Sequence, residues 1–354
     1  MKVALLLSGG VDSSVALRLL LEQGHEVEAF YLKIWLEDEL AFLGECPWEE
    51  DLRFAQAVCK QAGVKLHVLS LQREYYQRVV QYTLDELRAG FTPSPDIFCN
   101  QRIKFGVFFE KISPSFEKVA SGHYARLEWQ DKIPLLKTSP DPVKDQTYFL
   151  AHLDISQLQR CLFPLGNYTK AKVRQLASDF ALVNSSRKDS QGICFLGKIK
   201  FSEFIRHHLG TKEGDLVEWE TSKILGKHSG YWYYTIGQRK GIGLSGGPWY
   251  VVGKDIDQNI VYISHRRHLE QRSRNSFEVG EVHWLHPDMP APTRVKIRHG
   301  PQFYSCRFER EQRRVRILDG KDPGVAAGQF AVFYQGDTCL GCAKILPAPM
   351  PVPP

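Results

Sequence analysis

The sequence lacks any long hydrophobic run: nothing in its 354 residues approaches the roughly 18 uninterrupted apolar residues of a membrane-spanning helix. The short apolar run at the N-terminus is followed by Asp12 and has no small-residue cleavage pattern, which argues against a secretory signal peptide. There is no internal repeat, and the eight scattered cysteines do not suggest a disulfide scaffold. We therefore expect a cytoplasmic globular protein that does not bind membranes.

The sequence also has only a small excess of charge of one sign. It contains 46 Lys and Arg residues and 40 Asp and Glu residues, which gives a net charge of +6. The excess is concentrated near the C-terminus, where residues 265–316 hold twelve basic and six acidic side chains. Such a region attracts phosphate backbones, although a simple solvated face has the same composition.

What the sequence does contain is an alternation of apolar runs and helical patterns in its first half. We expect strands at 2–8, 27–35, 64–71 and from 117, and helices at 11–23, 48–63, 72–89 and 101–112. Strands separated by helices of this length predict a Rossmann-like parallel sheet.

Residues 201–209 still have a helical pattern, and after Gly210 the pattern becomes short β-rich runs between glycines, which is typical of small barrels and sandwiches. The predicted fold class is therefore α/β, followed by a small β-rich module and a β-barrel. The expected domains are residues 1–200 (catalytic), 201–274 (central module), 275–346 (C-terminal barrel) and 347–354 (disordered, proline-rich tail).

The first strand ends in SGGVDSS, residues 8–14, and a helical pattern follows directly. Backbone amides and hydroxyls at the positive end of a helix form an anion site, and Gly9 and Gly10 would let a ligand approach the backbone closely. An ordinary strand-to-helix turn capped by Ser8 or Asp12 has the same residues. The loop lacks the GK[ST] ending of a Walker A loop and the spacing of a dinucleotide fingerprint.

This loop resembles the signature of the PP-loop ATP pyrophosphatases, which cleave ATP between the α- and β-phosphates. The resemblance implies ATP as a cofactor, with Asp12 holding Mg²⁺ beside the phosphates; no structural metal is implied. The residues implied in ATP binding are Leu6, Leu7, Ser8, Gly9, Gly10, Val11, Asp12 and Ser13.

Two cysteines lie in segments that do not look like core. Cys99 follows a proline-containing loop, with a helix expected to begin near Asn100 and with Arg102 and Lys104 nearby; Cys194 follows a polar turn among lysines. A thiol at a helix N-terminus beside cations has a lowered pKa. Each could instead be a small buried hydrophobic residue.

Together with the loop, PDIFCN (95–100) and DSQGICF (189–195) resemble the tRNA-specific 2-thiouridylases of the MnmA type. The resemblance extends through ASGHYAR (120–126), KDQTYFL (144–150), TIGQRKGIG (235–243) and GQFAVFY (328–334). It implies that ATP adenylates the C2 oxygen of the wobble uridine, position 34, and that sulfur then replaces this oxygen, giving 2-thiouridine, AMP and pyrophosphate.

The resemblance also implies roles for individual residues. Cys194 would carry a persulfide delivered by a sulfur-relay partner, and its terminal sulfur would attack C2 directly or after release as hydrosulfide. Cys99 would resolve the persulfide, leaving a Cys99–Cys194 disulfide, and Asp96 would act as acid or base near the target base. The implied tRNAs are those for Lys, Glu and Gln.

Further contacts are implied by position. Leu32 and Gly122 would lie against the nucleotide, and Ser94, Pro95 and Asp96 next to the target base. The residues implied in contacts with tRNA are His123, Lys144, Asp145, Gln146, Arg298, His299 and Gln329. From the residues alone, Arg294, Lys296 and Arg298 alternate along an expected strand and would form a row of cations on one face.

Other features favour ordinary structure. Cys339 and Cys342 form a C-x-x-C without a second pair of suitable spacing, so strand residues are the better interpretation. Trp232, Tyr233 and Tyr234 could stack on bases but more often fill a core. The alternatives to a 2-thiouridylase are another PP-loop enzyme, such as a ligase or amidating synthetase, and a catalytically silent RNA-binding protein.

Overall fold

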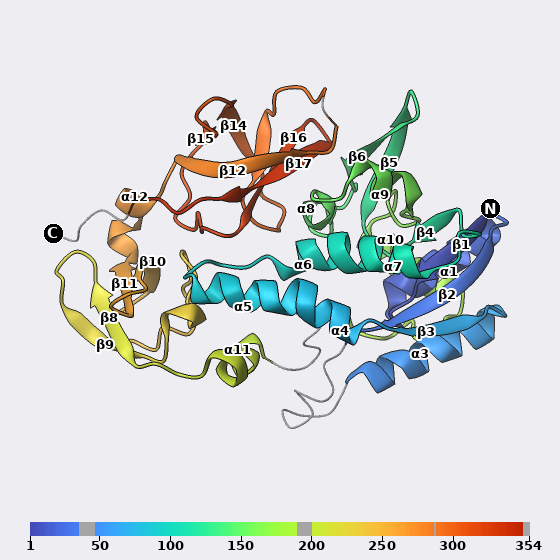
Figure 1. Cartoon of the computed structure of the whole chain (residues 1–354), viewed down its shortest axis with the longest axis horizontal. Coiled ribbons are helices and arrows are strands. Elements are labelled where there is room, and N and C mark those ends of the chain that lie inside the picture. The colour runs from blue at the N-terminus through green and yellow to red at the C-terminus, as the bar shows by residue number, and fades with distance from the viewer. Residues whose placement is uncertain (35–46, 190–199, 287, 350–354) are drawn as a thin grey trace.

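The computed structural model describes residues 1–34, 47–189, 200–286 and 288–349. Cys46 and Cys194 lie outside these ranges, as do residues 350–354 of the expected tail. Figure 1 shows three parts: an α/β domain that contains the N-terminus, a small central β module, and a C-terminal barrel that lies over the long helices between them. The predicted fold class is confirmed.

A five-stranded parallel sheet forms the centre of the first domain, in the order β3-β2-β1-β4-β7. Its strands are β1 (Lys2–Leu6), β2 (Glu26–Lys33), β3 (Leu66–Ser70), β4 (Lys118–Ala120) and β7 (Cys161–Leu162). Along β1, Val3 and Leu5 join one apolar cluster while Ala4 and Leu6 join the other. The strand is thus buried on both faces, which explains its uninterrupted apolar sequence.

Helices surround this sheet. Its strand order reverses between β1 and β4, because β2 and β3 lie on one side of β1 whereas β4 and β7 lie on the other. The helical segments of the domain are α1 (Val11–Glu22), α3 (Pro47–Ala62), α4 (Gln72–Tyr75), η2 (Tyr76–Val80), α5 (Gln81–Arg88), α6 (Pro95–Phe98), η3 (Cys99–Val107), α7 (Phe108–Lys111), α8 (Thr147–Leu150), α9 (Ile155–Arg160) and α10 (Lys170–Asp179). In open α/β sheets, such a reversal creates a crevice outside the carboxyl ends of the strands, and ligands bind in this crevice.

One sequence-based boundary was wrong, and one expected strand is followed by a second. The helix expected from about residue 101 begins at Pro95, because proline fits the first helical position, and continues through η3 into α7. The strand expected to begin at residue 117 is β4, which starts at Lys118 and ends at Ala120; a second strand, β5 (Ala125–Gln130), follows after residues 121–124. β5 leaves the parallel sheet and pairs with β6 (Ile133–Thr138) as a hairpin.

The central module holds a four-stranded sheet in the order β10-β11-β8-β9. Helix α11 (Phe201–Leu209) precedes it. The remaining elements of the module are β8 (Gly214–Glu218), β9 (Ile224–His228), η4 (Tyr231–Tyr233), β10 (Trp249–Asp255), β11 (Ile260–His265), η5 (Arg266–His268) and α12 (Leu269–Arg272). Tyr231, Tyr234, Val251 and Ile263 belong to its apolar core.

The C-terminal part is a barrel closed by pairing of β12 with both β15 and β17. Its strands are β12 (Ser276–Trp284), β13 (Arg294–Lys296), β14 (Tyr304–Glu309), β15 (Arg314–Ile317), β16 (Phe330–Gln335) and β17 (Thr338–Ile345). Cys339 and Cys342 are fully buried strand residues of β17, as expected. The β5–β6 hairpin of the first domain pairs with β17 through Lys137 and Thr338, and so extends the sheet of the C-terminal barrel.

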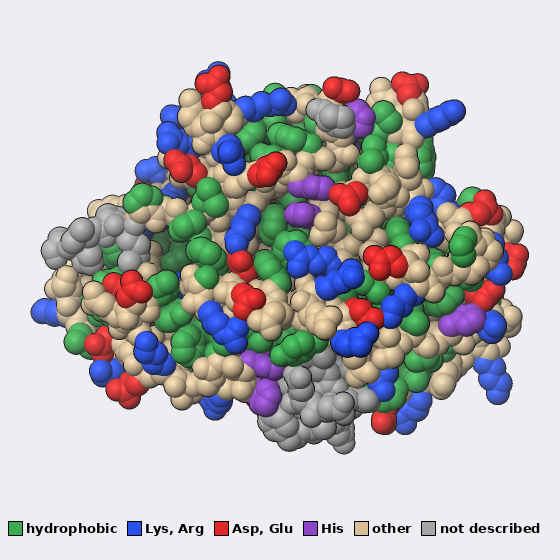
Figure 2. All heavy atoms as spheres, viewed as in Figure 1, with side chains coloured by type: hydrophobic (Ala, Val, Ile, Leu, Met, Phe, Trp, Pro, Cys, Tyr) green, Lys and Arg blue, Asp and Glu red, His purple; other side chains and the backbone are tan. Residues whose placement is uncertain are grey.

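No helix within the described ranges is long and apolar enough to cross a membrane. The face shown in Figure 2 mixes basic and acidic side chains over all three parts of the molecule.

Candidate functional site

The turn between β1 and α1 lies at the carboxyl end of β1, where the strand order of the parallel sheet reverses between β1 and β4. Gly10 is the N-cap of α1, and Ser13 and Ser14 both donate through their hydroxyls to its carbonyl, at 3.0 and 2.9 Å. The hydroxyls of Ser8 and Ser13 are 3.2 Å apart. The first amides of α1 point out of the helix end, which gives this turn the partial positive charge of an anion site.

Gly9 is needed for packing within the chain as well as for any ligand. It has a φ of +76°, and a Cβ at this position would lie 2.2 Å from the carbonyl oxygen of Asp51 in α3. Its own carbonyl accepts hydrogen bonds from buried Asn184 at 2.8 Å and from Arg187 at 3.0 Å. Gly122, after β4, is similarly confined, because a Cβ there would lie 2.9 Å from the amide nitrogen of Ser13. The turn is therefore held between α3 and the residues that follow β4.

Asp12 is the acidic residue of this turn, and two groups from elsewhere in the chain meet its carboxylate. Lys170 Nζ lies 2.6 Å and the Tyr124 hydroxyl 2.8 Å from Asp12 Oδ1. Burial and the charge of Asp12 raise the pKa of Tyr124, so this phenol is a fixed donor. Lys170 begins α10, which packs on α1.

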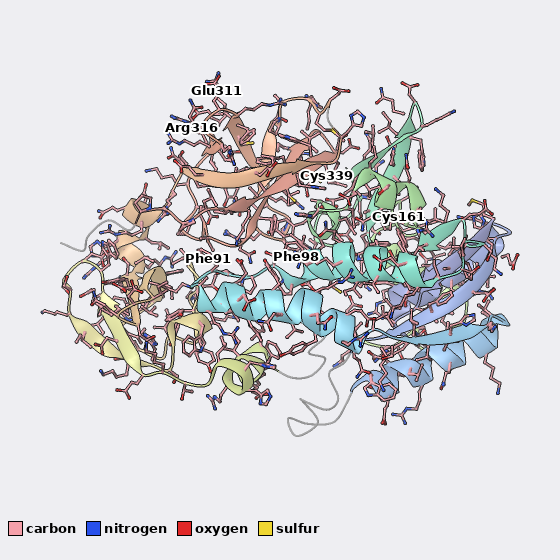
Figure 3. All side chains as sticks on the ribbon, viewed as in Figure 1. Phe91, Phe98, Cys161, Glu311, Arg316 and Cys339 are labelled. Carbon is pink, nitrogen blue, oxygen red and sulfur yellow. The ribbon has the colours of Figure 1, made fainter. Side chains whose placement is uncertain are left out.

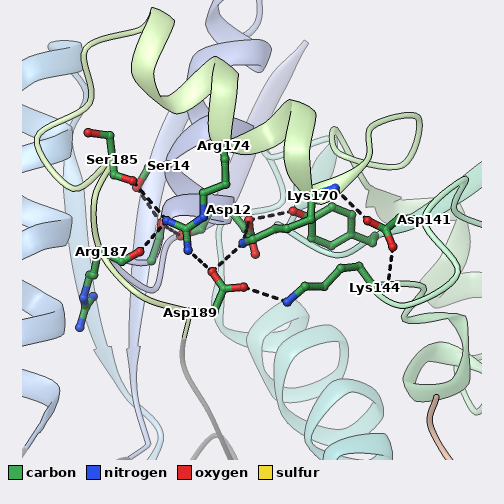
Figure 4. A network of polar contacts seen from close by, with 12 residues as sticks. Asp12, Ser14, Asp141, Lys144, Lys170, Arg174, Ser185, Arg187 and Asp189 are labelled. Atoms are coloured by element: carbon green, nitrogen blue, oxygen red, sulfur yellow. Dashed lines mark hydrogen bonds and ion pairs between the residues drawn. The ribbon is translucent and has the colours of Figure 1, made fainter. Parts of the chain in front are cut away.

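Asp189 gathers three cations beside Asp12 (Figure 4). Lys170 and Lys144 lie 2.8 Å from its two oxygens, and Arg174 from α10 also pairs with it. Burial alone would raise the pKa of Asp189, but the hydrogen bonds from Lys144 and Lys170 outweigh it and hold the pKa well below its ordinary value. The cluster therefore keeps the Asp189 carboxylate ionised among cations that can also bind phosphate oxygens.

The segment that contains Asp96 and Cys99 runs beneath the barrel, where Figure 3 labels Phe91 and Phe98. The barrel holds its beginning: Thr92 donates its amide to the Ala327 carbonyl at 2.8 Å, and Gln329 donates its side-chain amide to the Pro93 carbonyl at 2.9 Å. Gly328 has no room for a Cβ, which would lie 2.7 Å from the Thr92 carbonyl oxygen.

Cys99 lies one turn inside the helix that begins at Pro95, and not at a helix N-terminus. It is 1% exposed and belongs to the main apolar cluster, whereas Asp96, in the first turn, is half-buried. Arg102 stacks on Phe98, with its guanidinium 3.8 Å from the ring centroid. The proposed partner thiol, Cys194, lies outside the described residues.

Three consecutive residues expected to contact tRNA have contacts inside the protein. Lys144 pairs with Asp189, and Gln146 accepts the Tyr124 amide at 2.9 Å. Asp145 is 2% exposed and forms a buried ion pair with Lys296, whose Nζ lies 2.8 Å from Asp145 Oδ2. Within this conformation, Asp145 offers tRNA almost no surface.

The expected row of cations on the barrel was wrong. Lys296 is fully buried, and Arg298 follows the end of β13 and pairs with Asp322, with 2.5 Å between Arg298 Nη2 and Asp322 Oδ2. Lys296 contacts Asp145 of the first domain, whereas Arg298 is exposed and pairs within the barrel, so the three side chains do not form one solvent-facing row.

The two histidines expected to contact tRNA differ in exposure. His123 is 9% exposed, its Nδ1 is 2.7 Å from the Ser121 hydroxyl, and burial followed by the charge of Lys104 lowers its pKa well below the ordinary value. His299 is exposed, and its ring stacks on that of Phe149, with ring centroids 4.4 Å apart.

Several site residues were not identified from the sequence, namely Lys170, Arg174, Tyr124 and Asp189. Tyr124 and Asp189 occur within motifs that carried the resemblance, but Lys170 is 158 residues from Asp12 and had no local signal. The expected nucleotide contact Leu32 is partly buried near the end of β2, at the same edge of the sheet as the turn. Within the described ranges, no group of three or more His, Cys, Asp or Glu residues could hold a metal ion.

Comparison with known proteins shows similarity along nearly the whole chain. Residues 1–198 match the family described as tRNA methyl transferase HUP domain, residues 202–265 its PRC-barrel domain, and residues 274–345 the aminomethyltransferase beta-barrel domain. The chain is 43% identical to tRNA-specific 2-thiouridylase MnmA 1 of Bacteroides thetaiotaomicron, over 98% of this chain and 99% of that protein. It is 42% identical to the MnmA of Porphyromonas gingivalis ATCC 33277, with the same coverage.

Solved structures resemble it more weakly. A 4-thiouridine synthetase in complex with RNA and ATP aligns with a TM-score of 0.35 and 17% identity, over 59% of this chain and 50% of that one. A likeness at this level adds nothing to the assignment.

Proposed function

The chain belongs to the family of tRNA-specific 2-thiouridylases, and from that premise we propose that it replaces the C2 oxygen of the wobble uridine, position 34, with sulfur. It is accordingly a tRNA sulfurtransferase, and its expected location, the cytoplasm, follows from this substrate. The observation that best supports the chemistry is the Asp12 cluster: an anion-binding turn at a topological switch point, beside Lys144, Lys170 and Arg174.

In the first half-reaction, the turn at Ser8–Ser13 would bind the pyrophosphate portion of ATP. The C2 oxygen of uridine attacks the α-phosphorus, pyrophosphate leaves, and C2 then carries an adenylate as its leaving group. Lys170 and Arg174 are suited to neutralise the negative charge of this step, because both already pair with carboxylates at the turn. Mg²⁺, held by Asp12 beside phosphate oxygens, would require Lys170 to move from Asp12 to phosphate.

In the second half-reaction, the terminal sulfur of a Cys194 persulfide would attack C2 and displace AMP. The Cys99 thiolate would then attack the Cys194 sulfur, which breaks the persulfide bond, leaves sulfur on C2 and forms a disulfide between the cysteines. Since Cys99 is 1% exposed, this role requires its thiol to become accessible. A persulfide donor protein and a reductant would complete the cycle, and the tRNAs for Lys, Glu and Gln are the proposed substrates.

Mass spectrometry of wobble nucleosides tests this proposal in cells that lack the protein. We expect 2-thiouridine to disappear and to return with the wild-type gene, but not with Cys99→Ser or Cys194→Ser. Cys59→Ala changes a buried cysteine of α3 outside the proposed site and is the matched control. Normal 2-thiouridine without the protein, or restoration by Cys194→Ser, would contradict the assignment. ATP cleavage that needs a small amine and no tRNA would instead favour a ligase-type PP-loop enzyme.

A further inference from the structure

A cavity of about 200 Å³ lies where the first domain meets the central module. Pro93 and Pro95 line it from the segment before α6, Phe201 and Ser202 from the start of α11, and Trp232 and Tyr233 from η4. Pockets for drug-sized ligands usually have roughly 300–1,000 Å³, so this cavity suits a single small ring system.

The cavity has an aromatic wall with a fixed orientation. The Tyr233 hydroxyl donates to the Gly210 carbonyl at 2.8 Å, and the centroids of Trp232 and Tyr233 are 6.2 Å apart. Trp232 Nε1 is buried and has no hydrogen-bond partner in the described part of the chain. These two aromatic residues were expected to be core; they are only partly buried, and a planar ligand could stack on them.

None of the described residues that line the cavity is charged, while Ser202, Thr235 and Gln238 provide polar groups. A phosphate or carboxylate would therefore find no counter-ion among these described side chains. A neutral heterocycle with hydrogen-bonding edges fits both features, and unstacked nucleobases are recognised by aromatic stacking together with contacts to their edges.

The cavity adjoins the described part of the proposed sulfur-transfer site. Pro95 lines the cavity, whereas the next residue, Asp96, and Cys99 one turn later do not. Ser94, between the two lining prolines, is 8% exposed, and its hydroxyl has no partner within the described residues. A base in the cavity would thus contact Pro95 and lie close to Asp96 and Cys99.

We propose that this cavity binds the unstacked nucleobase that flanks the target uridine in the anticodon loop, with Trp232 as the stacking platform. This inference rests on the proposed function, since it needs tRNA as the substrate. It makes the central module part of substrate recognition, with the base next to the target held while sulfur is transferred.

The test is binding of anticodon stem-loop RNAs that are intact or that lack one base, either the target or one of its two neighbours. Stacking on an aromatic side chain is worth about 1–3 kcal/mol per base, so Trp232→Ala should weaken binding of the intact RNA about 5- to 150-fold. One of the two RNAs that lack a neighbouring base should bind the wild-type protein equally weakly. Trp232→Ala should not weaken that RNA further.

Two more variants keep the result interpretable. Ser202→Phe places a ring into the cavity from an exposed position without removing any apolar side chain, and should weaken the same RNA. Trp129→Ala removes a tryptophan that is 51% exposed on β5 and should leave every affinity within twofold.

Equal weakening of all the RNAs by Trp232→Ala and Ser202→Phe, or no weakening, would overturn the inference. The inference would also be overturned if Trp232→Ala weakened the binding of every RNA except the one that lacks the target base, because the cavity would then hold the target base itself. Failure of the proposed function has a different signature, since the wild-type protein would then transfer no sulfur to intact tRNA whatever binds in the cavity.

Discussion

At the scale of single residues, the candidate site depends on how a few charges share partners. Lys170 contacts both Asp12 and Asp189, so its ammonium group joins the carboxylate of the anion-binding turn to that of Asp189. Partly exposed ion pairs add little to stability, usually below about 1 kcal/mol. The value of this arrangement is therefore chemical, because a cation held at a helix N-terminus is ready to stabilise charge that develops on phosphate.

Replacing Lys170 should impair nucleotide chemistry much more than folding. We expect Lys170→Gln to lower kcat/KM for ATP by about 100- to 1,000-fold, the range seen when one group that stabilises the transition state is removed. Lys172→Gln is the control: its side chain contacts Gln175 on the same helix, α10, and activity should stay within twofold. Pyrophosphate release measures both. Equal activities of the two variants would remove Lys170 from the site.

At the scale of elements, the turn after β1 depends on α3 as much as on its own sequence. The glycines of the motif suggested close approach of a ligand, and the structure adds a reason within the chain, since the backbone of Gly9 contacts that of α3 at Asp51. Sequence patterns identified α1, α3 and α11 nearly to the residue, because each has clear apolar periodicity. They misplaced the start of the helix at Pro95, whose short apolar pattern gave no boundary.

Gly9→Ala should destabilise the protein by about 2–5 kcal/mol, because positive φ costs roughly 1–2 kcal/mol and the clash with α3 adds an overpacking penalty. Gly24→Ala separates these causes: Gly24 also has a φ of +76°, but a Cβ added there would have no atom within 4 Å. Urea unfolding should show the larger loss for Gly9→Ala. Similar losses for both variants would mean that packing against α3 does not matter.

At the scale of the whole molecule, contacts between the domains place the segment that contains Asp96 and Cys99. The barrel holds Thr92 and Pro93, the β5–β6 hairpin extends the barrel sheet, and Asp145 pairs with Lys296 in a fully buried setting. Residues expected to contact tRNA, such as Gln329 and Asp145, therefore have structural contacts first. Sequence alone could not show this, because each partner lies more than 100 residues away.

Breaking the Asp145–Lys296 pair should loosen the attachment of the barrel. Lys296→Met leaves a buried carboxylate without its partner, which typically costs about 3–5 kcal/mol. The double variant Lys296→Met with Asp145→Leu should recover most of that loss. Arg314→Met breaks an exposed pair with Glu278 and should cost less than about 1 kcal/mol. Urea unfolding measures these free energies. If Lys296→Met lowered the free energy of unfolding as little as Arg314→Met does, the Asp145–Lys296 pair would have no stabilising role.

Mild acid should also weaken the molecule at the boundary between domains, where the ring of His152 stacks on that of His283, with centroids 4.6 Å apart. Burial, followed by the charge of His283, lowers the pKa of His152 to about 4. With an unfolded pKa near 6.5, the unfolded chain binds more protons than the folded chain between these values. The contribution of His152 to the free energy of unfolding is therefore fully present above about pH 6.5. It decreases as the pH falls toward 4, by at most about 1.4 kcal/mol per pH unit.

The measurement is urea unfolding at several pH values between 7 and 5. His152→Phe keeps an aromatic ring against Phe98 and Phe330 and should flatten the pH dependence. His25→Gln, at the turn before β2, should leave it as in the wild-type protein. An unchanged slope in His152→Phe would exclude His152 as a source of acid sensitivity.

The sequence by itself determined the fold class, the anion-binding turn with Asp12, and the family, because local periodicity and short motifs are properties of neighbouring residues. Only the tertiary structure decided which cations meet Asp12, that Lys296 is buried against Asp145, and that Trp232 lines a cavity beside Pro95. The physical reason is distance along the chain. A charge pair or a cavity wall between residues more than 100 positions apart forms only when the sheet, the central module and the barrel pack together.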